Sequence, residues 1–99
     1  MRVEFRDDDL LRLFEEEEFR LPAIGPDLTK AYRKRVQILL AASDERDLYA
    51  MRSNRFEKLG GSRQGQHSLR LNDQWRLIIE LESGEDGKKA VVVEVVDYH

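Results

Sequence analysis

The alternation of side chains in residues 67–71 and 75–82 constrains the fold of this chain more than any other feature. The apolar side of the alternation is His67, Leu69 and Leu71 in the first segment, and Trp75, Leu77, Ile79 and Leu81 in the second. A period of two residues predicts β-strands that each bury one face. The two segments are therefore predicted to be neighbouring strands of one sheet that share a buried face.

The length of the loop between these strands sets their register. A three-residue loop, Asn72-Asp73-Gln74, pairs Leu71 with Trp75 and Leu69 with Leu77, so that the apolar residues share a face. It also pairs Arg70 with Arg76 on the opposite face. A two-residue loop would place Arg70 across from Trp75 and mix the two faces, so the odd loop is predicted.

The remaining chain is expected to form two helices and three further strands. Strands are predicted at residues 2–6, 55–59 and 88–97. A first helix begins at Asp7-Asp8-Asp9 and includes the acidic run Glu15–Glu18 in its last turns, and a second helix spans about Asp27–Ala42. The short Pro/Gly connection between the helices predicts an antiparallel pair. Residues 43–53 are predicted as loop with one helical turn at Asp44–Leu48.

The buried side of each element can also be predicted. The apolar residues of the second helix that repeat at helical spacing and are expected to face the core are Leu28, Tyr32, Val36, Leu39 and Leu40. His67 is expected to be a half-buried packing histidine, because it lies on the apolar side of its strand. Trp75 is expected in the core for the same reason.

The composition limits the chemistry that is available to the chain. There are 99 residues and no cysteine, which excludes disulfides and thiolate chemistry, and with only two histidines a zinc site is not expected. No cofactor is expected. The length predicts one domain over residues 1–99. The N-terminus has no apolar segment of signal-peptide length, so the expected location is the cytoplasm.

Charge is distributed unevenly along the chain, although the net charge is only −3. Residues 30–76 carry eleven Lys and Arg against five acids, whereas residues 1–20 carry four Arg against eight acids. Local potential steers a polyanion more than net charge does, so the basic middle is a candidate region for binding a nucleic acid. Alternatively, these cations simply surround a helix and a hairpin in solvent. The run Glu15–Glu18 is either a solvated helix face or an acidic edge that docks a basic partner.

Two blocks of the sequence resemble the HigB (plasmid killer) branch of the RelE/ParE toxin superfamily. One block runs from Phe56 through Asn72-Asp73-Gln74-Trp75-Arg76, and the other is the terminal Asp97-Tyr98-His99. The resemblance implies a RelE-like α+β fold, in which an N-terminal strand and a two-helix hairpin pack on a mostly antiparallel sheet. It implies a toxin of a type II toxin-antitoxin system that enters the ribosomal A site and cuts messenger RNA. It also implies a HigA-like helix-turn-helix antitoxin, encoded by a neighbouring gene, and a toxin-antitoxin heterotetramer.

The resemblance assigns roles to individual positions. Arg76 matches the arginine of the family's active site, and Tyr98 and His99 match its terminal Tyr-His pair. Gly60 departs from the pattern, because the family commonly has lysine there. One expected cation is therefore missing, and Lys58 and Arg63 are the candidates to replace it.

The chemistry of RNA cleavage supports the same residues. The reaction needs a base for the 2′-hydroxyl, an acid for the leaving oxygen and cations at the phosphate, and it requires no metal. His99 is the expected proton-transfer group, because imidazole titrates near neutral pH, and Tyr98 is expected to stack on a base or hold the phosphate. The candidate phosphate and RNA contacts are Arg76, Lys58, Arg63, Arg70 and Glu57. Glu57 is also a candidate second acid or base.

Two other functions remain open on the sequence. One is a toxin of the same fold that inhibits a protein target such as gyrase without cutting RNA. The other is an interaction module without catalysis, which the missing lysine at Gly60 leaves possible. The nuclease hypothesis requires the end of the chain to fold beside Arg76 in a shared cleft.

Overall fold

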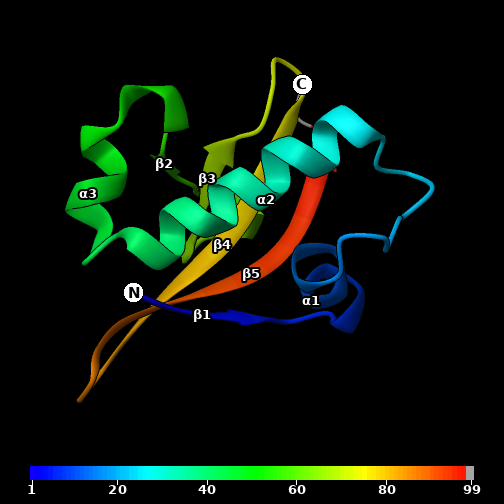
Figure 1. The fold of residues 1–99 in the computed structure, drawn as a ribbon. Coiled ribbons are helices and arrows are strands. Elements are labelled where there is room, and N and C mark those ends of the chain that lie inside the picture. Colours follow the sequence, from blue (N-terminus) through cyan, green and yellow to red (C-terminus); the bar gives the residue numbers. More distant parts are fainter. Residues whose placement is uncertain (98–99) are drawn as a thin grey trace.

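The computed structural model describes residues 1–97, so the predictions for Tyr98 and His99 lie outside the described residues. A single five-stranded sheet has the strand order β1-β5-β4-β3-β2. Its strands are β1 (Arg2–Phe5), β2 (Glu57–Lys58), β3 (Gln66–Arg70), β4 (Trp75–Gly84) and β5 (Gly87–Asp97). The helices are α1 (Asp8–Glu15), α2 (Pro26–Ala41) and α3 (Glu45–Ala50). α2 lies across one face of the sheet, which is referred to below as the helix face (Figure 1). The opposite face is called the open face.

The hairpin of β3 and β4 has the predicted register. Leu69 pairs with Leu77, and Arg70 pairs with Arg76. The side chain of Asn72 closes the loop, because its Oδ1 accepts hydrogen bonds from the N–H groups of Gln74 at 2.9 Å and Trp75 at 2.8 Å. Such local side-chain bonds are a common way for Asn to stabilise a turn. The predicted odd loop is confirmed.

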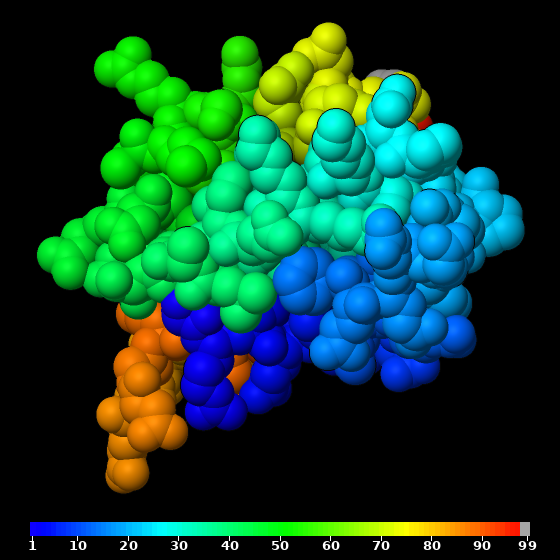
Figure 2. Space-filling model, viewed as in Figure 1, coloured from blue at the N-terminus to red at the C-terminus, as the bar shows by residue number. Residues whose placement is uncertain are grey.

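The sheet is mostly antiparallel, as expected for this α+β fold. Among the strands of residues 1–97, only β1 and β5 pair in parallel, and the other neighbouring strands are antiparallel. A register shift between Ile78 and Ile79 places Ile78 opposite Glu94 and Ile79 opposite Val92. β4 and β5 continue beyond the helices as a hairpin whose tip projects from the body (Figures 1 and 2).

The core lies between α2 and the helix face. Leu28, Tyr32, Val36 and Leu39 are buried as predicted, and burial of such a side chain contributes about 1.5–3 kcal/mol. The Tyr32 hydroxyl donates to the carbonyl of Leu10 at 2.7 Å and ties α2 to α1. Leu40 was predicted in the core but is 46% exposed. One residue rotates the helix by about 100°, so Leu40 leaves the side on which Leu39 is buried.

The first helix differs from the prediction in its length and direction. It ends at Glu15, and Glu16 already has an extended backbone with φ −105°. Adjacent acids repel one another and are disfavoured at the negative end of the helix dipole, so most of the acidic run lies beyond the helix. Figure 1 shows α1 almost end-on while α2 runs across the view, so the two helices cross and are not antiparallel.

The segment between α2 and β3 also corrects the prediction. α3 spans Glu45–Ala50, which is longer than the expected single turn. The predicted strand 55–59 begins only at Glu57, because Arg55 has a left-handed backbone with φ 42° that cannot continue a strand. β2 ends at Lys58, although the N–H of Leu59 still donates to the carbonyl of Gln66 at 2.9 Å. His67 is half-buried and stacks on Phe56 with ring centroids 4.9 Å apart, and Trp75 packs partly buried against the core. The prediction for His67 is confirmed, whereas Trp75 lies at the border of the core and not inside it.

The part of the chain that the structure describes contains no helix with the length and apolar character needed to span a bilayer.

Candidate active site on the open face

Arg76 is the most buried of the candidate arginines. It lies on β4, and the alternation of the strand directs its side chain to the open face, away from Leu77 and α2. The residue is only 8% exposed. A guanidinium cannot lose its charge at physiological pH, so burial requires that its N–H groups find acceptors.

Those acceptors are supplied by two neighbouring segments. Arg76 Nε and Nη2 donate to the hydroxyl oxygen of Ser68 on β3, at 3.2 and 2.8 Å. Nη2 also donates to the carbonyl oxygen of Arg55 at 2.5 Å. The carboxylate of Glu57 lies 3.9 Å from the same nitrogen. Two neutral oxygens therefore fix the direction of the guanidinium, and one exposed carboxylate lies close to it.

Arg35 contacts the turn that leads to Arg55, two residues before the carbonyl that accepts from Arg76. Arg35 Nε donates to the carbonyl of Arg70 at 2.8 Å, and its Nη2 donates to the carbonyl of Ser53 at 3.3 Å. Burial, and secondarily the charge of Arg70, lower the pKa of the Arg35 guanidinium from its ordinary value. Arg35 thus ties the turn that precedes β2 to the end of β3, and this turn presents the acceptor for Arg76.

Glu57 and Lys58 lie on opposite faces of the sheet. Glu57 pairs with Ser68 and extends toward Arg76, whereas Lys58 pairs with His67 on the helix face. Burial and the nearby charge of Lys58 lower the pKa of His67 below its ordinary value. The structure therefore brings Glu57 to Arg76 and directs Lys58 away from it.

Arg63 belongs to a polar network that crosses the open face. Its Nη1 donates to Gln66 Oε1 at 2.9 Å, and its Nη2 forms an ion pair with Glu94 at 2.6 Å. Gln66 Nε2 donates in turn to Glu80 at 3.0 Å, and Glu80 pairs with Arg6 at 2.5 Å. The hydrogen bonds from Arg6 and Gln66 lower the pKa of the Glu80 carboxyl. Arg63 thus lies on the same face as Arg76 and already contacts a carboxylate.

Arg70 also lies on the open face, directly across from Arg76. Its Nη2 contacts the carboxylate of Asp73 in the hairpin loop. Like charges that face each other on neighbouring strands repel, so a phosphate between Arg70 and Arg76 would relieve that repulsion. Asp73 is almost fully exposed, with 97% of its side-chain area accessible, and is therefore easily displaced from Arg70.

The end of the described chain leaves the sheet next to this cluster. Asp97 pairs with Trp75, and Val96 pairs with Arg76. Gln74 Nε2 donates to Asp97 Oδ2 at 2.9 Å, which fixes the strand end beside the hairpin loop. The predicted roles of Tyr98 and His99, which follow Asp97, concern residues outside the described part of the chain.

Gly60 occupies a position that other residues could fill. Its φ of −123° is ordinary extended backbone, and a Cβ added there would meet no atom within 4 Å. The adjoining Gly61 has φ 59°, where a side chain is strained. The absence of lysine at Gly60 therefore has no steric cause.

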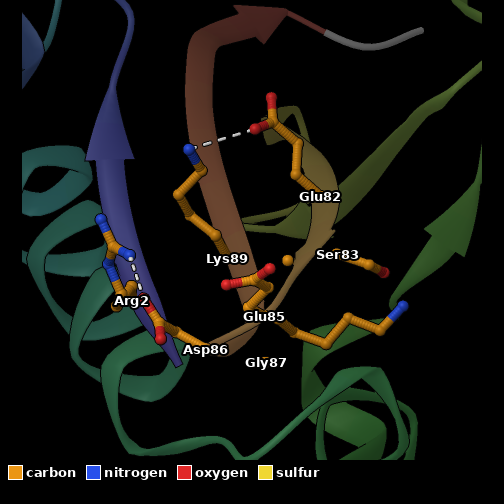
Figure 3. A pocket seen from close by; sticks show the side chains of 9 residues that line it. Arg2, Glu82, Ser83, Glu85, Asp86, Gly87 and Lys89 are labelled. Carbon is orange, nitrogen blue, oxygen red and sulfur yellow. Dashed lines mark hydrogen bonds and ion pairs between the residues drawn. The ribbon is translucent and has the colours of Figure 1, made fainter.

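Metal ligands and the cavity at the tip of the β4–β5 hairpin do not add to this candidate active site. Within residues 1–97 there is no group of three His, Cys, Asp or Glu side chains that could hold a metal ion. A small cavity of about 110 Å³ lies at the tip of the β4–β5 hairpin (Figure 3). Four of its charged side chains pair with each other, Lys89 with Glu82 at 3.1 Å and Arg2 with Asp86 at 3.5 Å. It lies at the far end of β4 from Arg76 and does not belong to the candidate site.

Sequence reasoning did not single out Ser68, Arg35 or the Arg55 carbonyl. Ser68 had a usable signal, since the predicted register already places it diagonally across from Arg76 on the open face. Arg35 had none, because on the sequence it is one of several cations of α2. Its importance comes from tertiary contacts with β3 and with the turn before β2.

Comparison with known proteins adds independent information. Residues 3–99 match the family described as RelE-like toxin of type II toxin-antitoxin system HigB. Toxin HigB-1 of Vibrio cholerae is 37% identical over 84 residues, which cover 85% of this chain and 87% of that protein. Two solved structures share the fold. The YoeB/ParE toxin from Agrobacterium tumefaciens has a TM-score of 0.57 at 12% identity and covers 100% of both chains. The YoeB-YefM complex from Staphylococcus aureus has a TM-score of 0.55 at 15% identity and covers 100% of this chain and 97% of that one.

Proposed function

Because the chain belongs to the RelE-like HigB toxins of type II toxin-antitoxin systems, we propose that it is an endonuclease that cuts messenger RNA on the ribosome. One observation carries this proposal beyond the family. The Arg76 guanidinium is held by Ser68 and Arg55 on the open face, where Arg63 and Arg70 also lie. A guanidinium that is fixed before the substrate binds is well suited to stabilise charge that develops on a phosphate.

The proposed reaction uses the ribose as its own nucleophile. The 2′-oxygen attacks the adjacent phosphorus, and the 5′-oxygen of the next nucleotide leaves. A base accepts the 2′-hydroxyl proton, and an acid donates a proton to the departing oxygen. The products are a 2′,3′-cyclic phosphate and a 5′-hydroxyl end.

Each site residue has a proposed part in this reaction. Arg76 neutralises the non-bridging oxygens, and His99 is one of the two proton-transfer groups. Tyr98 stacks on a base or contacts the phosphate, and Glu57, which lies 3.9 Å from Arg76, is the candidate second acid or base. Lys58 can add a second cation only by reaching around the edge strand β2, because its strand position faces His67. These side chains supply both proton transfers, so no divalent metal is proposed in the cleavage step.

Arg63 and Arg70 are proposed to bind the RNA backbone. Both contact carboxylates in the free protein, Glu94 and Asp73 respectively. Exchange of an exposed carboxylate for a phosphate keeps each guanidinium paired, and exposed ion pairs contribute only about 0–1 kcal/mol to stability. The exchange therefore costs little.

The family also implies an antitoxin partner. We propose that it is a HigA-like helix-turn-helix protein that forms a heterotetramer with this chain in the cytoplasm. The fold shared with a solved YoeB-YefM complex supports the existence of a bound partner and not its type.

Mapping of messenger RNA 5′ ends after brief induction tests the proposed activity. New 5′-hydroxyl ends inside translated coding regions are expected, and they should disappear when translation initiation is blocked. Arg46→Lys, which alters an exposed arginine paired with Asp44, serves as the charge-matched control and should leave the ends unchanged. Growth arrest without new ends, with DNA replication stopping before translation, would instead favour a toxin that inhibits a protein target.

A further inference from the structure

β1 is an edge strand with an unpaired outer side. It lies at one end of the sheet order and pairs only with β5 among the described strands. The N–H of Arg6 donates to the carbonyl of Val92 at 2.9 Å. In a parallel ladder alternate residues turn both their N–H and C=O groups to the same neighbouring strand. The backbone groups of Glu4 and Arg6 therefore face β5, and the backbone groups of Val3 and Phe5 face away from the sheet. Such an edge can pair with one more strand.

An apolar hollow of about 450 Å³ lies beside this edge. It is lined mainly by Val3, Phe5, Leu11, Phe14, Leu40 and Glu15. The rings of Phe5 and Phe14 stack with centroids 5.9 Å apart. Figure 2 views the molecule from the side on which β1, α1 and the C-terminal part of α2 meet. Leu40, which the helical pattern predicts in the core, is 46% exposed and contributes to this hollow. An edge strand and an apolar hollow thus lie together, as in strand-addition sites.

The charge around the hollow selects the kind of partner. Glu15 lines the hollow, opens the acidic run Glu15–Glu18, and forms no ion pair with any residue of the described range 1–97. Glu4, at the same edge, is already paired with Lys89 at 3.2 Å. An acidic rim disfavours RNA. It also disfavours a second copy of this chain, because the same carboxylates would be brought face to face.

We propose that this edge and hollow bind a basic, extended segment of the antitoxin. The segment adds a strand along Val3 and Phe5 and inserts one apolar side chain beside Phe14 and Leu40. It places Lys or Arg against Glu15. This inference rests on the proposed toxin-antitoxin function. β1 and β2 lie at opposite edges of the sheet, so this contact supplies affinity at a distance from the turn that holds Arg76.

The test uses the full-length helix-turn-helix protein encoded by the neighbouring gene, co-purified with the toxin. Glu15→Lys and Leu40→Lys should each weaken its affinity by about tenfold or more. Glu18→Lys makes the same charge change in the same acidic run outside the hollow, and it should change the affinity by less than about twofold. Thermal unfolding of each free variant confirms that it is folded.

A second measurement needs no substitution. Amide hydrogen exchange followed by NMR should show that the N–H groups of Val3 and Phe5 become protected in the complex, because they gain hydrogen bonds to the added strand. Unchanged exchange at both amides, together with equal affinity of all three variants, would overturn the proposed docking site and leave the nuclease proposal standing. Failure of the neighbouring protein to bind at all, with no RNA cleavage by the free toxin, would overturn both.

Discussion

A guanidinium that is hydrogen-bonded before its substrate arrives loses little conformational freedom when a phosphate binds. Arg76 is in this state, because the Ser68 hydroxyl and the Arg55 carbonyl both accept from it. At the scale of single residues, the strength of the site therefore depends on Arg76 and on how many further cations surround the phosphate.

Gly60 gives a direct test of that dependence. Gly60→Lys fits an ordinary extended backbone with no atom within 4 Å of its Cβ, so it should leave the unfolding midpoint unchanged. It should raise the rate constant for cleavage on programmed ribosomes by about tenfold, which is less than the 10²–10³ typical of a fully positioned group. Gly60→Gln is the uncharged control of similar length. An equal increase with Gln, or no increase with Lys, would show that this position does not serve the phosphate.

His67 gives a prediction about pH. Its pKa is lowered by burial and by Lys58, so the folded protein binds a proton less readily than the unfolded chain. Stability is therefore fully present above the ordinary imidazole value of 6.5 and is lost as pH falls from there through the lower pKa of the folded state. The urea concentration at the midpoint of denaturation should decrease when the pH is lowered from 7.5 to 5.5. In His67→Phe, which keeps a ring against Phe56, the fall should be smaller. Identical falls in the two proteins would assign the acid sensitivity to other groups.

At the scale of elements, the short turn before β2 helps to determine the orientation of Arg76. It carries Arg55 with a left-handed φ of 42° and the acceptor for Arg76. Conformations of this kind are costly for residues other than glycine and persist only where the surroundings hold them. Arg35 binds the same turn through the carbonyl of Ser53, two residues before Arg55, so we expect it to help hold this conformation.

Arg35→Met should therefore impair catalysis indirectly. Loss of its two hydrogen bonds is expected to cost about 1–3 kcal/mol of stability. It should lower kcat more than it raises KM, because Arg76 loses its orientation and the surface cations remain. Arg35→Lys should restore part of kcat. Lys34→Met removes an exposed charge from the same helix and is the control. If Arg35→Met had a normal kcat at a temperature where it is folded, Arg35 would not be a positioning residue for Arg76.

How much of each element could be predicted depends on which interactions determine it. Period-two alternation and the Asn72 turn are local, so the register of Arg70 against Arg76 could be predicted. The exposure of Leu40 could not, because it depends on which side of α2 meets the sheet. The end of α1 was predicted too late in the chain, although repulsion within the acidic run is itself a local signal. The candidate site divides in the same way. Arg76 was found from a resemblance and a register, and the same register could have indicated Ser68. Arg35 acts through contacts that tertiary packing creates.

At the scale of the whole molecule, charge is separated although the net charge is −3. Arg63, Arg70 and Arg76 lie on the open face, whereas Glu15 lies beside β1, at the opposite edge from β2. The open face suits a polyanion and the β1 edge suits a cationic segment. Added negative charge is therefore expected to weaken binding at the open face, and added positive charge is expected to weaken binding at the β1 edge.

The salt dependence of binding to ribosomes tests whether the open face contacts RNA. Arg63→Gln and Arg70→Gln should each weaken binding to programmed ribosomes and reduce the slope of log K against log salt by about 0.7, the value for one phosphate contact on single-stranded nucleic acid. Arg46→Gln removes the same charge from α3 and should leave the slope unchanged. An unchanged slope in both test variants would place the RNA elsewhere on the surface.

The most direct test of the central claim is the single-turnover rate of messenger RNA cleavage by Arg76→Lys on programmed ribosomes. Lysine keeps the charge but cannot contact a phosphate while also donating to Ser68 and Arg55. At a temperature where the variant is folded and binds ribosomes normally, cleavage should be slower by about 10²–10³. Cleavage at the wild-type rate under those conditions would show that Arg76 stabilises the fold and not the reaction.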